Sequence, residues 1–367
     1  MFILTINFLL LICYLVFIYI IWHGLTKIKA CGNQQLLTVS IIVAMRNEAS
    51  LAARCLDALL NLDYPRDLYE IIVVDDGSTD RTPLILSDFQ SRYPFIRFIR
   101  LNQYQSLKGD KKRALTIGIS KSSNEILLFT DADCVPPPGW IKQIISCFDN
   151  EVGLVAGFSP VRLKKNTQFA QMVELDSFAA AIVAAAAIGN DSAVTCTGRN
   201  LAYRRQLFYR LNGFDQLRRS ISGDDDLLLQ LAHRQMDWKI RYVSHRDGIV
   251  PSYPELSRLQ LFRQKQRHLS AGKYYSPKIQ LYYAAFHLSN AGLFLFPLVA
   301  MLTENPLWLS LIFLIVKILS DRLLLNSAGR KFSQTFITSS FLGWELFFLF
   351  YHIITAPAAF IGKIKWK

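Results

Sequence analysis

Two aspartates, Asp131 and Asp133, are separated by a single residue and follow an apolar, strand-like run. Carboxylates at this spacing can both approach one hard cation where a strand ends in a turn, and oxygen ligands suit Mg²⁺ or Mn²⁺. A cation held there acts as a Lewis acid and neutralises charge on a departing diphosphate. The pair therefore predicts a divalent metal site.

A second acidic cluster consists of three consecutive aspartates, Asp224, Asp225 and Asp226, placed before a leucine-rich helical run. A carboxylate in this position could take the proton from an attacking hydroxyl. The positive end of a helix dipole also favours acidic residues at a helix start, without any catalytic role. The residues alone leave both interpretations open.

The elements that must position these acids alternate between strand and helix from residue 37 onward. Strands are expected at 38–43, 70–74, 95–101 and 125–130, with helical patterns between them. This alternation predicts an α/β fold whose mostly parallel sheet has helices on both faces. In such sheets ligands bind beyond the carboxyl ends of the strands.

Three of the expected strands end in polar or acidic residues. The side chains concerned are Arg46 and Glu48, Asp75 and Asp76, and Asp131 and Asp133. Each aspartate alone is explained by a turn or a helix cap. Three strands that deliver polar groups to one edge are better explained by a binding site.

Both ends of the chain are apolar. Residues 1–22 carry no charged side chain, and about 20 apolar residues in a helix cross a bilayer. Because the run is longer than a signal peptide and ends in bulky residues, we predict a retained anchor over residues 1–24. Lys27 and Lys29 follow it, which places the N-terminus outside and the main domain in the cytosol.

Three further apolar segments, 279–303, 307–325 and 336–361, predict about three C-terminal transmembrane helices within residues 279–361. Lys317 and Asp321 interrupt the second of these and need a buried partner or a position near the helix end. Four spans would leave the basic tail 363–367 outside, against the positive-inside rule. Either one segment is re-entrant or interfacial, or the rule fails here.

The 367 residues carry a net charge of +13, with basic residues beside the apolar runs. This distribution favours contact with anionic headgroups and makes nucleic acid a poor candidate partner. The cysteines form no CxxC pair, which argues against a disulfide framework or a zinc site and predicts free thiols in a reducing cytosol. They are Cys13, Cys31, Cys55, Cys134, Cys147 and Cys196.

Two basic segments have both a surface and a binding interpretation. Residues 258–273 alternate basic and apolar side chains, as in an amphipathic helix at a membrane surface, and Gln264, Arg267 and His268 could face the site and hold a diphosphate. The segment 108–113 (KGDKKR) is either a solvated charge cluster or a phosphate contact. The first segment lies in an expected interface region, 256–278.

The central part of the chain resembles the family 2 glycosyltransferases, inverting enzymes with a GT-A fold. The run EIIVVDDGSTDRT at 70–82, preceded by LDYP at 62–65, is the most specific signal, and the likeness extends from Val39 to about Lys273. It implies a cytosolic GT-A domain over residues 36–255. Gln264, Arg267 and His268 match the family's QxxRW motif, with histidine in place of tryptophan.

The resemblance assigns expected roles to individual residues. The nucleotide-sugar site would comprise Ala44, Arg46, Glu48, Asp75, Asp76, Lys111 and Asp131, and the metal would be held by Asp131 and Asp133. Asp225 would be the general base, with Asp224 in place of the family's usual glutamate. Acceptor and diphosphate contacts would come from Gly198, Asn200, Gln264, Arg267 and His268.

The expected function is therefore a metal-dependent, membrane-anchored glycosyltransferase of the cell envelope. It would move a sugar from a nucleotide-sugar donor to a hydroxyl of a lipid or lipid-linked acceptor, as a multi-pass protein of the inner or plasma membrane. Two alternatives remain: a processive polysaccharide synthase, and an inactive membrane assembly factor. Asp76, Asp131, Asp133 and Asp225 argue against the inactive protein.

Overall fold

The computed structural model describes residues 2–101, 110–220, 222–235, 237–255, 257–303, 305–335 and 338–361. The expected residues Lys108, Gly109 and the basic tail 363–367 lie outside these ranges. The globular part is built on a seven-stranded sheet in the order β3-β2-β1-β4-β6-β5-β7. The strands are β1 (Val39–Met45), β2 (Tyr69–Asp75), β3 (Ile96–Arg100), β4 (Ile126–Asp131), β5 (Val152–Gly157), β6 (Leu201–Arg204) and β7 (Lys239–Val243).

The sheet is mostly parallel, as the sequence predicts. Strand β1 pairs in parallel with both β2 and β4, and β2 pairs in parallel with β3. Strand β6 alone among these seven runs antiparallel, between β4 and β5. The four expected strands are confirmed as β1 to β4, whereas β5, β6 and β7 were not foreseen.

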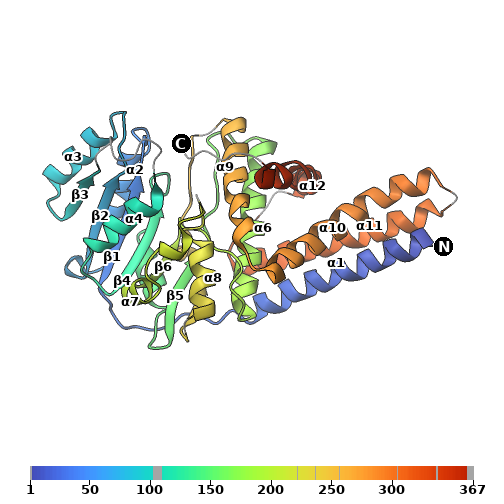
Figure 1. Ribbon diagram of the computed structural model, residues 1–367, viewed down its shortest axis with the longest axis horizontal. Helices are drawn as coiled ribbons and strands as arrows, with labels where there is room; N and C mark the ends of the chain where they lie inside the picture. The colour runs from blue at the N-terminus through green and yellow to red at the C-terminus, as the bar shows by residue number, and fades with distance from the viewer. Residues whose placement is uncertain are drawn as a thin grey trace.

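Helices cover both faces of the sheet (Figure 1). Alternate residues of β1 point to opposite faces, so Ile42 belongs to one core and Ile41 to the other. The first core also contains Leu115, Phe178 and Leu228. The helices of the globular part are α2 (Ala52–Leu60), α3 (Thr82–Arg92), α4 (Lys111–Ser120), α5 (Trp140–Ile145), α6 (Gln168–Gly189), α7 (Arg205–Arg210), α8 (Asp226–Gln235) and α9 (Arg258–Ser270).

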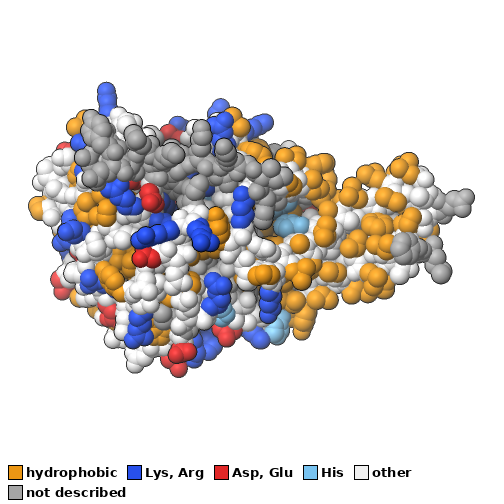
Figure 2. All heavy atoms as spheres, viewed as in Figure 1, with side chains coloured by type: hydrophobic (Ala, Val, Ile, Leu, Met, Phe, Trp, Pro, Cys, Tyr) orange, Lys and Arg blue, Asp and Glu red, His pale blue; other side chains and the backbone are white. Residues whose placement is uncertain are grey.

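Three long helices, α1 (Phe2–Thr26), α10 (Pro277–Met301) and α11 (Leu307–Lys331), pack side by side in a bundle that projects from the globular part (Figure 1). The visible surface of the bundle is largely apolar, and Lys and Arg side chains gather on the globular part (Figure 2). Leucines that would be buried in a soluble protein are exposed there, including Leu281, Leu288 and Leu319. Such a surface suits a lipid environment.

Within the described residues, four stretches are long and apolar enough to cross a membrane: Ile3–Thr26, Gln168–Gly189, Pro277–Met301 and Ser340–Ala359. Helix α11 is too charged to be included on composition, because Lys317, Asp321 and Arg322 lie within it. The stretch Gln168–Gly189 is helix α6, which the sequence analysis did not identify. More than half of it is buried within the protein.

Three helices lie across the long axis of the bundle at its foot. Helices α6 and α9 run transversely, and α12 (Thr338–Ile361) is viewed almost end-on in Figure 1. Helix α12 packs on both α6 and α9. The structure therefore has a transverse layer, formed by α6, α9 and α12, at the foot of the bundle.

A close crossing of two helices joins the bundle to this layer. A Cβ atom on Gly24 of α1 would lie 2.1 Å from the carbonyl oxygen of Ala186, and one on Gly189 of α6 would lie 2.0 Å from the carbonyl oxygen of Gly24. Only glycine permits this backbone approach. Asn190 donates from Nδ2 to the carbonyl oxygen of Ile20 at 2.9 Å, which fixes the crossing.

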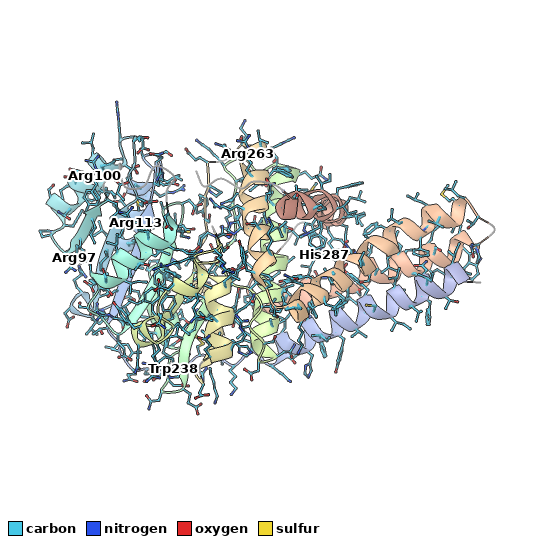
Figure 3. All side chains as sticks on the ribbon, in the orientation of Figure 1. Arg97, Arg100, Arg113, Trp238, Arg263 and His287 are labelled. Carbon is cyan, nitrogen blue, oxygen red and sulfur yellow. A yellow bond between two sulfur atoms is a disulfide. The ribbon has the colours of Figure 1, made fainter. Side chains whose placement is uncertain are left out.

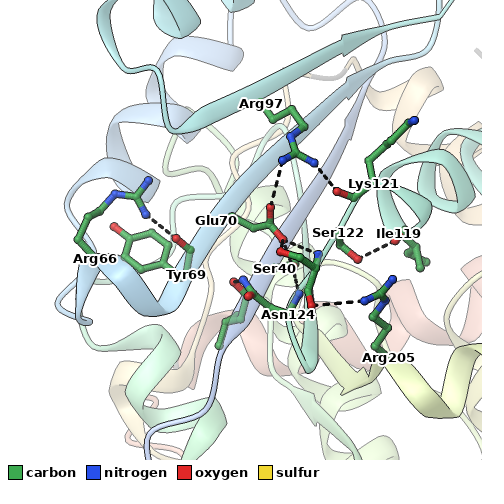
Figure 4. Close-up of polar contacts among 12 residues, drawn as sticks. Ser40, Arg66, Tyr69, Glu70, Arg97, Ile119, Lys121, Ser122, Asn124 and Arg205 are labelled. Atoms are coloured by element: carbon green, nitrogen blue, oxygen red, sulfur yellow. Dashed lines mark hydrogen bonds and ion pairs between the residues drawn. The ribbon is translucent and has the colours of Figure 1, made fainter.

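A polar network closes the sheet edge formed by the amino ends of its parallel strands (Figure 4). Glu70 Oε1 accepts hydrogen bonds from Ser40 Oγ at 2.6 Å and from the Ser123 amide at 2.8 Å, and Arg97 Nη2 lies 3.9 Å from Glu70 Oε2. These bonds lower the pKa of Glu70 despite its partial burial, which opposes ionisation. This edge is opposite the one where ligands are expected.

The prediction that all cysteines are free thiols is wrong for one pair. Cys31, in the segment between α1 and β1, is joined by a disulfide to Cys147, which follows α5. The amides of Gly32 and Asn33 also donate to the carbonyl oxygen of Ser146, at 3.2 and 3.0 Å. The chain fold brings together two cysteines 116 residues apart, a proximity that sequence spacing does not reveal.

Candidate active site

Strand register brings the expected site residues to one edge. Ala44 near the end of β1 is aligned with Val74 of β2 on one side and with Asp131 of β4 on the other, and Met45 is aligned with Asp75. The carboxyl ends of three neighbouring strands therefore coincide. The segments that follow these strands carry Arg46, Asp76 and Asp133.

Asp76 connects the end of β1 to the start of helix α4. Arg46 donates from Nη1 to the carbonyl oxygen of Asp76 at 3.0 Å, and the same Nη1 lies 3.7 Å from Asp76 Oδ2. Asp76 Oδ2 accepts from the amide of Asp110 at 2.7 Å. Asp110 in turn caps α4 by accepting from the Arg113 amide. This arrangement places Lys111 at the first turn of α4, beside the strand ends.

Two of the expected nucleotide-site residues are involved in holding loops. Asp75 is fully buried and accepts the Ser78 amide at 3.1 Å through Oδ1. Burial raises the pKa of Asp75, and the Ser78 bonds only partly oppose that rise. The Glu48 amide donates to Thr82 Oγ1 at 2.9 Å. Asp75 and the Glu48 backbone therefore stabilise the loops that follow β2 and β1. Arg46 and Asp76 contact each other where these two loops meet.

Lys111 lies at the centre of the acidic cluster. Its Nζ atom is 3.0 Å from Asp131 Oδ1 and 3.2 Å from Asp224 Oδ2. Burial alone would lower the pKa of Lys111, but Asp131, Asp224 and Asp225 together raise it above its ordinary value. The ammonium therefore remains charged and joins the end of β4 to the acidic triplet at the start of α8.

Asp131 remains ionised. Burial opposes this, but Lys111, followed by Arg199 and Arg267, lowers the pKa of Asp131 below its ordinary value. Arg199 was not among the expected site residues, although it stands between Gly198 and Asn200. The sequence held one signal for Arg199: it is a positively charged residue inside a loop that was expected to line the site.

The residues at the end of β4 fit a divalent metal. Magnesium is usually bound by one or two protein carboxylates together with substrate phosphates and waters. Asp131 and Asp133 offer two carboxylates, and both are partly exposed. Within the part of the chain that the structure describes, no group of three or more His, Cys, Asp or Glu side chains is arranged to hold a metal. Asp131 and Asp133 therefore suit a metal ion whose remaining ligands include the oxygens of a bound diphosphate.

Asp225 is held in place by two backbone amides. Its Oδ2 accepts from Gly198 at 2.9 Å and its Oδ1 accepts from Asp226 at 2.8 Å. A Cβ atom on Gly198 would lie 3.5 Å from Asp224 Oδ2, Asp225 Oδ2 and Lys111 Nζ alike. The loop at Gly198, the acidic triplet and the lysine therefore meet around one point.

Asp226, the third member of the triplet, lies against Asp225, and its carboxyl group also reaches Tyr275. It is buried, and Tyr275 donates a hydrogen bond from its hydroxyl to Asp226 Oδ2. Burial first, then the charge of Asp225, raises the pKa of Asp226 well above its ordinary value. Tyr275 follows the short helix η5 (Ala271–Tyr274) just before α10, so this bond ties the triplet to the helix bundle. Tyr275 was not among the expected site residues.

Helix α9 brings Arg267 and His268 to the same region. It begins with a capping box in which Ser257 and Gln260 exchange hydrogen bonds. Ser222 Oγ donates to the carbonyl oxygen of Arg267 at 3.1 Å, so α9 is fixed to the loop before the triplet. Gln264 is partly buried on the preceding turn.

His268 is neutral although its side chain keeps exposed surface. Reduced solvation, then the charges of Arg267, Arg199 and other nearby cations, lower its pKa to about 3. A neutral imidazole has one donor and one acceptor nitrogen. It offers polar contacts where the family motif has an indole.

Asn200 does not face this region, although an acceptor contact was expected of it. It is fully buried, and its Oδ1 accepts from Trp140 Nε1 at 2.9 Å. Its Nδ2 donates to the carbonyl oxygens of Phe158 and Gly248, at 2.9 and 2.8 Å. The side chain is used in holding strands and loops together beneath the Gly198 loop, so the expected direct contact is replaced by a positioning role.

Comparison with known proteins identifies the family. The model for "Glycosyl transferase family 2" matches residues 40–211, and that for "Glycosyl transferase family group 2" matches residues 126–361, more than half of the chain. The chain belongs to the family 2 glycosyltransferases. It is an enzyme of the glycosyltransferase class with an α/β, GT-A-like fold and apolar helices near both ends.

Curated relatives match this glycosyltransferase over part of their length. "Probable glycosyltransferase YdaM" of Bacillus subtilis is 28% identical over 54% of this chain and 47% of its own. "Beta-monoglucosyldiacylglycerol synthase" of Synechocystis sp. is 34% identical over 30% of this chain and 22% of its own. The chain thus spans half or less of these relatives.

One solved structure resembles this glycosyltransferase over nearly its whole length. It is the mannosyltransferase PcManGT of Pyrobaculum calidifontis, solved with GDP-Man and Mn²⁺. The TM-score is 0.62 with 20% identity, and the match covers 97% of this chain and 98% of the other. At that identity the likeness establishes the shared fold.

Proposed function

We propose that this glycosyltransferase moves a sugar from a nucleotide-sugar donor to a hydroxyl of a lipid or lipid-linked acceptor at the membrane. The observation that carries the proposal is the meeting of Lys111, Asp224 and Asp225 around the Gly198 loop, beside the end of β4. A donor-side cation and a candidate base are thereby within reach of one reacting centre. The transverse layer places this centre close to the bundle.

The donor side of the reaction is assigned to the ends of β1, β2 and β4. Arg46 and Asp76 would bind the nucleotide, and Lys111 would contact the diphosphate. Asp131 and Asp133 would hold Mg²⁺ or Mn²⁺, which supplies charge neutralisation for the departing diphosphate. Arg199 and Arg267, which already influence Asp131, add positive charge where that diphosphate would lie.

Asp225 is assigned the role of general base. It would accept the proton of the acceptor hydroxyl while the oxygen attacks the anomeric carbon and the diphosphate leaves from the opposite face, with inversion. The amides of Gly198 and Asp226 keep the carboxylate oriented. Proton acceptance by a positioned carboxylate contributes roughly a hundred- to ten-thousand-fold to rate.

We assign three spans and a transverse layer on the cytosolic side. Helices α1, α10 and α11 would cross the bilayer, and α6, α9 and α12 would lie along its cytosolic face because they run across the bundle axis (Figure 1). Three spans put the basic tail 363–367 on the same side as the catalytic domain, as the positive-inside rule requires. Helix α12 is then the interfacial segment, which removes the topological conflict.

This assignment keeps the expected domain boundaries: an anchor at 1–24, a catalytic domain at 36–255, an interface region at 256–278 and membrane helices at 279–361. Of the C-terminal helices, two rather than about three would span. Single cysteines introduced near residue 335 and near residue 303 should differ in labelling by a membrane-impermeant maleimide added outside whole cells. Only the position near 303 should react, and labelling near 335 would overturn the topology.

The full chain in nanodiscs provides the test of function. Nucleotide sugars are screened for a rise in the thermal midpoint in the presence of Mn²⁺, since a ligand of the folded state stabilises it by mass action. The donor found is then incubated with the chain and a lipid extract, and the products are analysed by mass spectrometry. A lipid carrying one added sugar supports the proposal. Long carbohydrate chains from one initiation would favour a polymer synthase, and no donor binding would favour an inactive protein.

A further inference from the structure

A row of neighbouring aromatic rings, tilted or stacked on one another, leads from the candidate active site into the membrane bundle. The rings belong to Tyr275, Tyr283, His287 and His352, hereafter the aromatic seam. Ring centroids are 6.3 Å apart for Tyr275 and Tyr283, 6.3 Å for Tyr283 and His287, and 4.4 Å for His287 and His352. Figure 3 shows His287 at the foot of the bundle, near α12.

The seam begins at the acidic triplet. The Tyr275 hydroxyl donates to Asp226, whose amide donates to the candidate base Asp225 at 2.8 Å. From there the rings follow α10 and pass to α12 through His352. Tyr283, His287 and His352 are only partly buried. The seam therefore offers ring faces with polar tips along a path between the bilayer level and the base.

Polar atoms without protein partners lie along this path. Asn290 is one turn beyond His287 on the same side of α10. It is 2% exposed, and its Oδ1 has no hydrogen-bond partner in the protein. The Nδ1 atom of His352 is likewise buried without a partner. Burying such groups is costly, and a ligand bearing hydroxyl groups would remove that cost.

The charges around the seam favour a neutral ligand. Lys265 and Lys317 lie close to it, and both are ion-paired. Lys265, which acts electrostatically on His352, lies 2.5 Å from Asp176. Lys317, which lies over the ring of Phe294 one turn beyond Asn290, is bound by both Asp321 and Glu345. Because this one ammonium is shared by two carboxylates, it has no positive charge to spare for a phosphate at this end of the seam.

We propose that the aromatic seam and Asn290 bind the headgroup of a neutral, hydroxylated lipid, of the diacylglycerol or glycosyl-diacylglycerol class, and guide its hydroxyl toward Asp225. This identifies the acceptor class and rests on the proposed function. Hydroxyl groups would pair with Asn290 and His352, and the rings would pack against the glycerol or sugar. The acyl chains would remain against the apolar bundle surface.

Binding of lipid alone tests the proposal without any sugar transfer. The full chain is placed in phosphatidylcholine nanodiscs containing dioleoylglycerol, its monoglucosyl derivative or a polyprenyl phosphate, and retained lipid is measured by native mass spectrometry. One of the neutral lipids should bind, and the lipid phosphate should bind at least about tenfold more weakly, the difference made by one or two polar contacts. Tighter binding of the lipid phosphate would overturn the proposal.

Asn290→Leu and His352→Phe should each weaken binding of the neutral lipid about tenfold, because each removes a polar contact and keeps a side chain of similar shape. Leu288→Ala, at an exposed position on α10, is the matched control and should bind normally. Thermal midpoints show whether each variant folds, and Asn290→Leu should fold well because an unpaired buried polar atom is lost. Unchanged binding in both folded variants would show that Asn290 and His352 serve packing or hold water.

The outcomes separate this proposal from the proposed function. If the seam binds neutral lipid but no nucleotide sugar supports transfer, the proposed function is wrong and the proposed lipid site stands. If the chain glycosylates a lipid phosphate and Asn290→Leu does so equally well, the function remains and the seam proposal fails. Asp225→Asn should retain lipid binding in either case.

Discussion

Lys111 Nζ lies 3.0 Å from Asp131 Oδ1, so a fixed ammonium sits beside the candidate metal site. Lys111→Met should lower the stability of the metal-free protein by about 1.5–3 kcal/mol, the range for a hydrogen bond to a charged group, because Asp131 and Asp224 would then repel. Mn²⁺ should raise the thermal midpoint more in this variant than in the parent. Lys121→Met, at the exposed end of the same helix, is the control. Equal Mn²⁺ shifts in all three proteins would contradict the assignment.

Asp225→Asn should slow transfer by roughly a hundred- to ten-thousand-fold, because an amide cannot accept the acceptor proton. Donor binding, followed separately by thermal shift, should change little. Asp215→Asn, at an exposed aspartate that begins a short 3-10 helix (Asp215–Leu217), should behave as the parent. Near-normal turnover by Asp225→Asn would remove this residue from the mechanism.

Asp226→Asn should change how stability depends on pH. The folded-state pKa of Asp226 is raised, so the parent's carboxyl contributes most below its unfolded pKa of about 4, and that contribution declines as the pH rises through the folded value. Asparagine does not titrate and can still accept from Tyr275. The variant should therefore gain stability relative to the parent as the pH rises, measured by urea unfolding at several pH values. A difference independent of pH would refute the reasoning.

Asn200→Ala should destabilise the domain by about 1–3 kcal/mol for each buried group left without its partner. The groups are Trp140 Nε1 and the carbonyl oxygens of Phe158 and Gly248. Asn61→Ala, at an exposed helix end, should cost little. If Asn200→Ala folded as stably as the parent but lost acceptor binding, Asn200 would have to be assigned again as a direct contact of the acceptor.

Lys317→Met should destabilise the bundle by about 3–5 kcal/mol, because it leaves Asp321 and Glu345 buried without their cation. Lys317→Met with Glu345→Gln should recover part of this loss, since one unpaired charge is then removed. Thermal unfolding in nanodiscs measures both, with Leu319→Ala on the lipid-exposed side as control. Identical midpoints for the single and double variants would show that Glu345 is not coupled to Lys317.

Much of the fold was predictable because it depends on local patterns. The β-branched runs gave β1 to β4, and the long apolar segments gave α1, α10, α11 and α12. Helix α6 was missed because its alanine-rich sequence has little polar alternation, and the short strands β5 to β7 lack strong flanking signals. A buried partner or a position near the helix end was expected for Lys317 and Asp321, and the structure shows Lys317 paired with Asp321 and Glu345.

The sequence by itself determined the family, through the DDGSTD and DAD segments, and the acidic residues at the strand ends, because parallel strands carry such residues to one edge. Only the tertiary structure decided which of these carboxylates meet. It placed Lys111 between Asp131 and Asp224, turned Asp226 toward Tyr275 and buried Asn200. It also paired Cys31 with Cys147 and laid α12 across the bundle. These relationships join segments far apart in the chain, and they are set by packing, which local spacing does not encode.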